Sequence, residues 1–123
     1  VKQILLMIAV VALVGCGETP TNWNWVSDPS DPNNVKVERQ IRGAIKKPTG
    51  ELTKADLEKV TYLYLSINQL TSVKCLEKLT QLTEVNLTRN QLTDVKGLEN
   101  LDQLKELDLY NNQLTDVTGL EKL

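Results

Sequence analysis

The sequence contains no histidine and no phenylalanine, and its longest uninterrupted apolar run, Ile4 to Val14, has only 11 residues. The absence of histidine removes the commonest general base and metal ligand, and with it many enzyme mechanisms. A membrane-spanning helix needs about 20 apolar residues, so this run is too short to be one. The 14 Lys and Arg are nearly balanced by 16 Asp and Glu, and a net charge of −2 does not indicate nucleic-acid binding. At 123 residues, the chain has room for one domain.

The sequence does contain a short repeat, which occurs two and a half times between Asn68 and Leu123. The segments NQLTSVKCLEKLTQLTEVNLTR, NQLTDVKGLENLDQLKELDLYN and NQLTDVTGLEKL align without a gap at an offset of 22 residues. A repeat of this length is typical of a solenoid of stacked coils. The alternation around Val85 and Leu87 predicts a short strand in each coil. The three-residue apolar spacing after Asn90 predicts turns and single 3₁₀ coils on the return path.

An asparagine recurs where each predicted strand bends into the return path, at Asn68, Asn90 and Asn112. Backbone groups lose their partners at such a bend, and a stacked amide can donate to them and accept from them. We therefore expect this Asn ladder to be structural and not catalytic.

The pattern L-x-x-V-x-L-x-x-N-x-L at this period resembles the leucine-rich repeat, and LTDVKGLENLDQL resembles its internalin-like bacterial variety. The resemblance covers residues 57–123. It implies an α/β solenoid with a short parallel β-sheet on the concave face and turns or 3₁₀ coils on the convex face. It also implies a function in binding another macromolecule. The segment VERQIRGAIKKPTGELTKADLEKVTYLYLS resembles the lead-in of bacterial leucine-rich-repeat surface proteins.

Residues 1–15 have the pattern of a signal peptide, with Lys2 ahead of the apolar run. Leu13-Val14-Gly15-Cys16 resembles the lipobox of bacterial lipoproteins, in which the peptide is cut before the cysteine. The resemblance implies a diacylglycerol on the thiol of Cys16, which would anchor the exported protein to a membrane. Gly17 replaces the Asp that commonly retains such proteins in the inner membrane, so in a Gram-negative source we expect the outer membrane. An uncleaved anchor and an ordinary signal peptide are the alternatives.

The next segment, residues 16–34, has the proline-rich, polar composition of a flexible tether behind the lipidated cysteine. Trp23 and Trp25 are unusual in a linker. They either pack on the following cap, lie at the level of the lipid headgroups, or contact a ligand.

Residues 35–59 are expected to form a helical N-terminal cap. The spacing of Val37, Ile41, Ala44 and Ile45 predicts an amphipathic helix over residues 35–47, and a capping box at Thr53 predicts a brief helix through residue 59. Leucine-rich repeats follow over residues 60–123, with the last unit incomplete. An uncovered coil exposes apolar surface, so we expect a fragment of a longer repeat protein or a protein that associates end to end.

Outward strand positions are expected to form columns across the concave face, continued at the strand ends by Ile67, Arg89 and Asn111. Tyr and Arg are enriched at binding hot spots, so this face is the candidate recognition surface. Solvated positions without a ligand, and tyrosines that merely cover the cap junction, are the alternatives. The candidate binding residues are Tyr62, Tyr64, Glu84, Asn86, Arg89, Glu106, Asp108 and Tyr110.

Cys75 stands where the other units have glycine, at Gly97 and Gly119. Without a nearby histidine it is expected to be a buried structural thiol, with a disulfide between chains as the alternative. The Glu77, Glu99 and Glu121 column would stack like charges about 5 Å apart, which predicts an exposed, solvated face.

These features favour a lipid-anchored binding module of the cell envelope that presents its sheet to a protein or glycan. The alternative is a structural, self-assembling envelope spacer without a specific ligand. We expect no enzyme, no metal site and no cofactor besides the covalent lipid. Paired carboxylates such as Glu106 and Asp108 would lie side by side on an open face, without a pocket.

Overall fold

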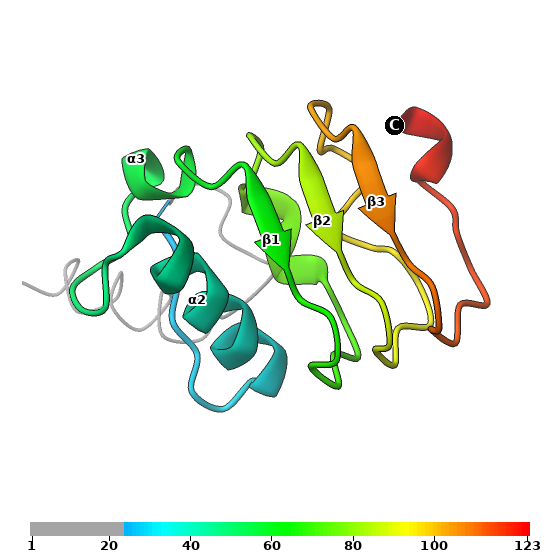
Figure 1. The fold of residues 1–123 in the computed structure, drawn as a ribbon, viewed down its shortest axis with the longest axis horizontal. Coiled ribbons are helices and arrows are strands. Elements are labelled where there is room, and N and C mark those ends of the chain that lie inside the picture. Colours follow the sequence, from blue (N-terminus) through cyan, green and yellow to red (C-terminus); the bar gives the residue numbers. More distant parts are fainter. Residues whose placement is uncertain (1–23) are drawn as a thin grey trace, which may run out of the picture.

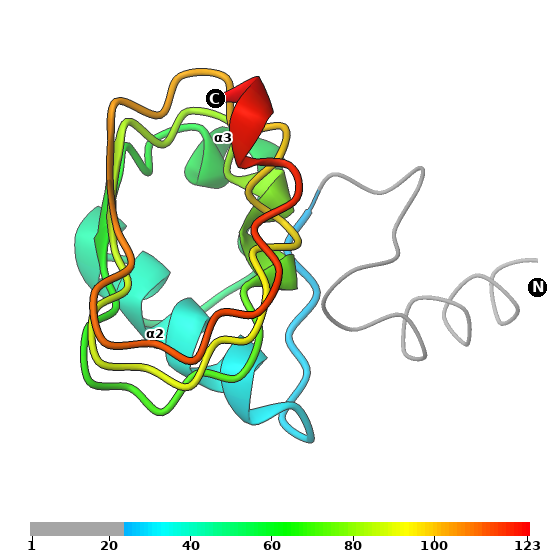
Figure 2. The same ribbon diagram turned by 90° about the vertical axis from the view of Figure 1, so that its right-hand side faces the viewer.

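The computed structural model describes residues 24–123 and contains a short solenoid closed at one end by a helix. The elements are α2 (Pro32–Ile45), α3 (Lys54–Leu57), β1 (Tyr62–Tyr64), β2 (Glu84–Asn86) and β3 (Glu106–Asp108), with 3₁₀ turns at Lys74–Lys78 and Leu120–Lys122. In Figure 1 the strands lie side by side, with α2 at one end of the row and the C-terminus at the other. In Figure 2, down the stack, the coils superimpose around one interior. The predicted solenoid is confirmed.

The sheet has three parallel strands in the order β1-β2-β3, and its register follows the 22-residue offset. Tyr62 pairs with Glu84, which in turn pairs with Glu106. In each strand the central residue points inward and the two flanking residues point outward, because side chains alternate along a strand. The predicted columns are therefore present.

The core is a ladder of aliphatic side chains stacked from coil to coil. Leu63 and Val85 of neighbouring strands are almost fully buried, whereas Leu107 of β3 is only half-buried. Each fully buried leucine contributes about 1.5 to 3 kcal/mol relative to an exposed one. In the last coil the half-buried apolar residues are Leu104, Leu107, Leu109, Leu114 and Leu120.

Helix α2 begins three residues before its predicted start and ends two residues before its predicted end. Asp31 is the N-cap, and its carboxylate accepts a hydrogen bond from Asn33 N at 2.9 Å. Pro32 occupies the first turn, where its missing N–H is not needed. At the other end, Lys46 adopts the left-handed conformation at φ 55° and terminates the helix. The Asp31-Pro32 pair is thus the start of the helix and not part of a tether.

Residues 24–34 belong to the cap and not to a tether, so the predicted boundary at residue 34 is wrong. The side chain of Trp25 is 6% exposed, and its Nε1 donates to Glu38 Oε2 at 2.9 Å. Trp25 N also donates to Leu52 O at 3.0 Å. Asn34 is buried, and its amide donates to Val26 O. Trp25 therefore packs on the cap, which is one of the three alternatives given for the tryptophans.

Trp23, Cys16 and the predicted signal peptide lie outside the described residues. Within residues 24–123, no helix combines the length and apolar character needed to cross a bilayer.

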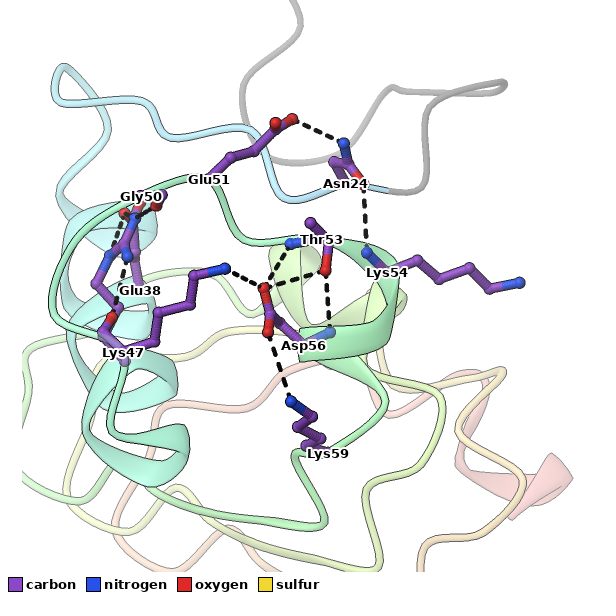
Figure 3. Close-up of polar contacts among 10 residues, drawn as sticks. Asn24, Glu38, Lys47, Gly50, Glu51, Thr53, Lys54, Asp56 and Lys59 are labelled. Carbon is purple, nitrogen blue, oxygen red and sulfur yellow. Dashed lines mark hydrogen bonds and ion pairs between the residues drawn. The ribbon is translucent and has the colours of Figure 1, made fainter.

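The start of α3 is held by the predicted capping box, which is part of a larger polar cluster around Asp56 (Figure 3). Thr53 N donates to Asp56 Oδ2 at 2.9 Å, and Asp56 N donates to Thr53 Oγ1 at 3.3 Å. Lys47 Nζ donates to the same Oδ2 at 2.7 Å, and Lys59 lies 3.8 Å from Oδ1. The hydrogen bond from Lys47, followed by that from Thr53 N, lowers the pKa of Asp56 from 3.8 to about 2.

Asp56 therefore makes the stability of the cap dependent on acid pH. A carboxyl whose folded pKa is lowered stabilises the fold fully above its unfolded value, near 3.8, and loses that contribution as the pH falls towards 2. We expect Asp56→Asn to lower the melting temperature at pH 7 and the difference from wild type to disappear near pH 2. Thermal unfolding followed by circular dichroism across this range measures it. Asp102→Asn, which removes an exposed carboxylate, is the control; a pH-independent deficit in D56N would contradict the assignment.

Candidate binding surface

The eight candidate binding residues lie together on the outer face of β1, β2 and β3 and at the ends of β2 and β3, and we call this the sheet surface. Tyr62, Tyr64 and Tyr110 are 48%, 52% and 69% exposed. Glu84 and Asn86 are half-buried, and the remaining members are exposed. The parallel register brings the β1 tyrosines next to the carboxylates of β2.

The two tyrosines of β1 form an ordered pair beside Glu84. Their ring centroids are 5.5 Å apart at an interplanar angle of 46°, a tilted arrangement that aromatic rings favour. Tyr64 Oη donates to Glu84 Oε1 at 2.9 Å. This hydrogen bond, together with the negative charge of Glu84, raises the pKa of Tyr64. The rings are therefore held in place while about half of their surface stays accessible.

Among residues 24–123, the carboxylates of the sheet surface form no salt bridge. Glu84 lies directly opposite Glu106 in the β2–β3 register, and like charges in that relation are destabilising. All four salt bridges among residues 24–123 lie in the cap, and none involves Glu84, Glu106 or Asp108. The sheet surface consequently combines aromatic rings with uncompensated negative charge.

Two of the candidate residues also have a local structural role. Asn86 Oδ1 accepts from Thr88 N at 3.0 Å and from Thr88 Oγ1 at 2.9 Å. Asp108 Oδ1 accepts from Tyr110 N at 3.0 Å. Both side chains thus fix the turn after their strand. Asn and Asp favour this role because their side-chain oxygen can accept from the N–H of the residue two positions later.

The residues after the strands adopt a left-handed backbone at equivalent positions in each coil. Ile67, Arg89 and Asn111 have φ values of 55°, 55° and 57°. Asparagine tolerates this conformation, but a β-branched isoleucine there is strained by about 1 kcal/mol or more. The side chain of Ile67 is nevertheless 67% exposed. It therefore exposes apolar area at the end of β1 at a cost to stability.

The Asn ladder is placed where backbone groups lack partners. Asn90 Oδ1 accepts from Asn68 N at 3.1 Å and from Leu70 N at 3.0 Å. Its Nδ2 donates to Leu65 O and Leu87 O, both at 2.9 Å. Asn112 repeats the pattern one coil later, donating to Leu87 O and Leu109 O and accepting from Leu92 N. The amides of Asn90 and Asn112 thus bind backbone atoms of two successive coils.

The column of Glu77, Glu99 and Glu121 differs from its prediction as an exposed, solvated face. Glu99 Oε2 accepts from Gly97 N at 2.7 Å, and Glu121 Oε2 accepts from Gly119 N at 2.8 Å, so both carboxylates cap the turn in which they lie. Glu77 is half-buried, and its pKa is raised by burial and by the charge of Glu99. The pattern of charges alone does not indicate this backbone N–H, two residues earlier, as the partner of Glu99 and Glu121.

Cys75 occupies the position of these glycines but not their conformation. Gly97 and Gly119 have φ values of 105° and 106°, whereas Cys75 lies within the 3₁₀ turn Lys74–Lys78 and is 4% exposed. Cys75 is a free thiol. Its expected burial is confirmed.

The described residues contain no group of three or more His, Cys, Asp or Glu arranged to hold a metal ion.

This geometry defines a class: a solenoid of stacked coils whose parallel sheet presents an open surface, an architecture that serves interaction with macromolecules. The family model described as Leucine Rich repeats (2 copies) matches residues 58–100 and again 81–122. The chain belongs to the leucine-rich-repeat family.

Solved structures with a similar fold come from two bacteria. The chain resembles internalin C2 from Listeria monocytogenes, with 28% identity over 75% of this chain and a TM-score of 0.68. It also resembles the internalin InlF of that organism, with 32% identity over 72% and a TM-score of 0.64. It spans 44% and 26% of those two chains. A structure containing the INT domains of Clostridium perfringens ZmpB matches at 26% identity over 72% of this chain and 18% of that one, with a TM-score of 0.54.

A comparison with curated proteins gives no match. The predicted internalin-like repeat is supported, and the fold class is confirmed.

Proposed function

We propose that the protein is a lipid-anchored binding module of the cell envelope whose sheet surface captures a protein partner through a basic, Lys- or Arg-bearing segment. The observation that carries the proposal is the unpaired charge of Glu84, Glu106 and Asp108 beside the ordered pair Tyr62 and Tyr64.

A cationic side chain of the partner would satisfy both parts of the surface. Placed over a tyrosine ring, it gains a cation–π interaction, and placed between the carboxylates it relieves the repulsion between Glu84 and Glu106. The exposed and strained Ile67 supplies adjacent apolar contact area. Tyrosine and arginine at the strand ends, Tyr110 and Arg89, extend the surface with residue types common at hot spots.

The anchor is the second part of the proposal. It rests on the signal-like run and the lipobox ending at Cys16. A lipidated Cys16 would hold the repeats at the membrane, in the outer membrane if the source is Gram-negative. Such an attachment is effectively permanent with several acyl chains.

The binding half is tested by replacing Tyr62, Tyr64, Arg89 and Tyr110 with alanine in one variant. We expect the affinity for a captured partner to fall at least about 100-fold, because truncated aromatic and arginine hot spots each contribute about 2 kcal/mol or more. The partner is captured by photo-crosslinking at the sheet surface on intact cells, and its affinity for the purified protein is then measured by calorimetry.

The matched control replaces four exposed residues of the return path with alanine: Lys74, Gln81, Lys96 and Gln103. Both variants should keep the wild-type melting curve within a few degrees. Unchanged capture by the first variant would reject the sheet surface as the binding site. Capture of a glycan in place of a protein would retain the surface but reject the basic partner.

A structural spacer that self-associates end to end is the second candidate. The half-buried leucines of the last coil favour it, because Leu107, Leu109 and Leu114 form a surface on which another coil or copy can stack. Analytical ultracentrifugation separates the two candidates, since only the spacer predicts self-association that grows with concentration.

A further inference from the structure

The charged residues on the outer face of α2 are all basic. Val37 and Ile41 are buried against the solenoid. Lys36, Arg39, Gly43 and Lys46 are spaced three or four residues apart, so they form one stripe on the opposite side of the helix. The only acidic residue of α2 is Glu38, and its carboxylate is bound by Trp25 Nε1 and Arg42 Nε, both at 2.9 Å. Glu38 and Asp28 line a hollow beside Arg39, but the Glu38 carboxylate is engaged by Trp25 and Arg42, so the stripe itself is basic.

The C-terminal half of this stripe borders a shallow hollow of about 490 Å³, lined by Arg39, Arg42, Gly43, Lys46 and Pro48. Arg42 shapes the hollow: its guanidinium donates to Lys47 O at 3.1 Å and to Gly50 O at 2.9 Å, and so holds the loop that follows the helix.

Arg39 and Lys46 are exposed and form no salt bridge within residues 24–123. The helix C-terminus favours a cation at Lys46, but it does not account for Lys36 and Arg39, which lie further back along the helix.

The chain enters the cap close to α2. Asn24 Nδ2 donates to Glu51 Oε1 at 2.7 Å, and Lys54 N donates to Asn24 Oδ1 at 3.2 Å, so residue 24 is fixed to the segment that follows α2 (Figure 3). Only seven residues, 17–23, separate it from Cys16. Fully extended, they and the flanking bonds span at most about 28 Å. A lipid on Cys16 would thus hold residue 24, and with it the cap, within about 28 Å of the bilayer.

We propose that the basic stripe of α2 rests on the anionic lipid headgroups of the membrane that anchors the protein. This docking rests on the proposed lipid anchor. In Figure 1, α2 closes the end of the solenoid opposite the C-terminus, so a cap lying on the bilayer directs the row of strands away from it. The sheet surface would then face sideways, open to a partner in the same envelope. Each cation near an anionic membrane strengthens association about fivefold.

The test uses the full, lipidated protein reconstituted in vesicles, with a fluorophore attached at Gly43→Cys. Gly43 lies in the stripe, and a side chain there meets no atom within 4 Å. Cys75 is buried and protected from labelling. A quencher carried by the headgroups should quench the label several-fold more on vesicles containing phosphatidylglycerol than on pure phosphatidylcholine. High salt should remove the difference, because it screens exposed charges.

Two charge-reversal variants decide the outcome. Arg39→Glu with Lys46→Glu should return the quenching to the level on neutral vesicles. Lys96→Glu with Lys105→Glu, which changes net charge equally at exposed positions of the repeats, should leave it unchanged. Equal quenching on both lipids, or a response to soluble heparin but not to phosphatidylglycerol, would overturn the docking. Intact mass is measured first: an unacylated Cys16 rejects the anchor, whereas an acylated protein with equal quenching rejects only the docking.

Discussion

Replacing Gly97 with alanine is expected to lower the free energy of unfolding by about 3 kcal/mol or more. Gly97 has φ 105°, a conformation that is strained for any residue with a side chain. A Cβ there would lie 2.4 Å from Val73 O and 2.7 Å from Lys74 Cα, both backbone atoms of the preceding coil. Relief would require the two coils to move apart. Chemical denaturation measures the loss, and the melting temperature should fall by more than about 10 °C.

Two other glycines provide controls that separate strain from collision. Gly119 has nearly the same φ, 106°, but its added Cβ would meet the Cβ of Glu99 at 3.0 Å and no backbone atom that closely. Gly119→Ala should therefore cost only about 1 kcal/mol. Gly43 lies in α2 with open space around it, and Gly43→Ala should stabilise the protein by about 0.5 to 1 kcal/mol. If G97A were no worse than G119A, close packing of the coils at Gly97 would not be what requires the glycine.

The repeats could be predicted from the sequence because equivalent positions in each coil pack in the same way and carry similar residues. An offset of 22 residues fixes which side chains stack, so the columns Tyr62, Glu84, Glu106 and Tyr64, Asn86, Asp108 follow from the alignment alone. A parallel strand must alternate its side chains between core and solvent, and this alternation placed the candidate residues on the outer face.

The cap could be predicted only in part, because no second copy of it exists to align. Trp25 and Asn34 lie in a stretch of linker-like composition, yet both are buried by contacts with residues up to 27 positions away. The amino-acid composition of a segment does not indicate contacts with residues distant in the sequence. The basic stripe of α2 does not follow from the apolar spacing of the helix, because it depends on Glu38 being bound by Trp25.

Side chains that bind the backbone of a turn are the hardest features to predict from the sequence. A column of glutamates indicates repulsion, and only the backbone geometry shows that Glu99 and Glu121 each accept from an N–H two residues earlier. The strain at Ile67 is of the same kind, since the sequence does not reveal that this position is left-handed in every coil. Local backbone conformation, and not residue type, determines both.

Asn90→Ala is expected to be the most destabilising change in the Asn ladder, at about 4 kcal/mol. The side chain of Asn90 is 6% exposed. Its removal leaves the N–H groups of Asn68 and Leu70 and the carbonyls of Leu65 and Leu87 without this partner in the interior. Each buried polar group without a partner costs about 1 to 3 kcal/mol, reduced where water enters the space left behind. Equilibrium unfolding in urea gives the loss directly.

The ladder supplies its own graded controls, because the three asparagines differ in burial. Asn112 satisfies three backbone groups but is half-buried, so Asn112→Ala should cost about 2 kcal/mol. Among residues 24–123, the side-chain amide of Asn68 donates to Ser66 O alone, at 3.0 Å, and Asn68→Ala should cost about 1 kcal/mol or less. Equal losses at all three positions would show that the common turn, and not the buried hydrogen bonds, sets the cost. The expected order, Asn90 above Asn112 above Asn68, follows from how many backbone groups each amide binds and how far water is from them.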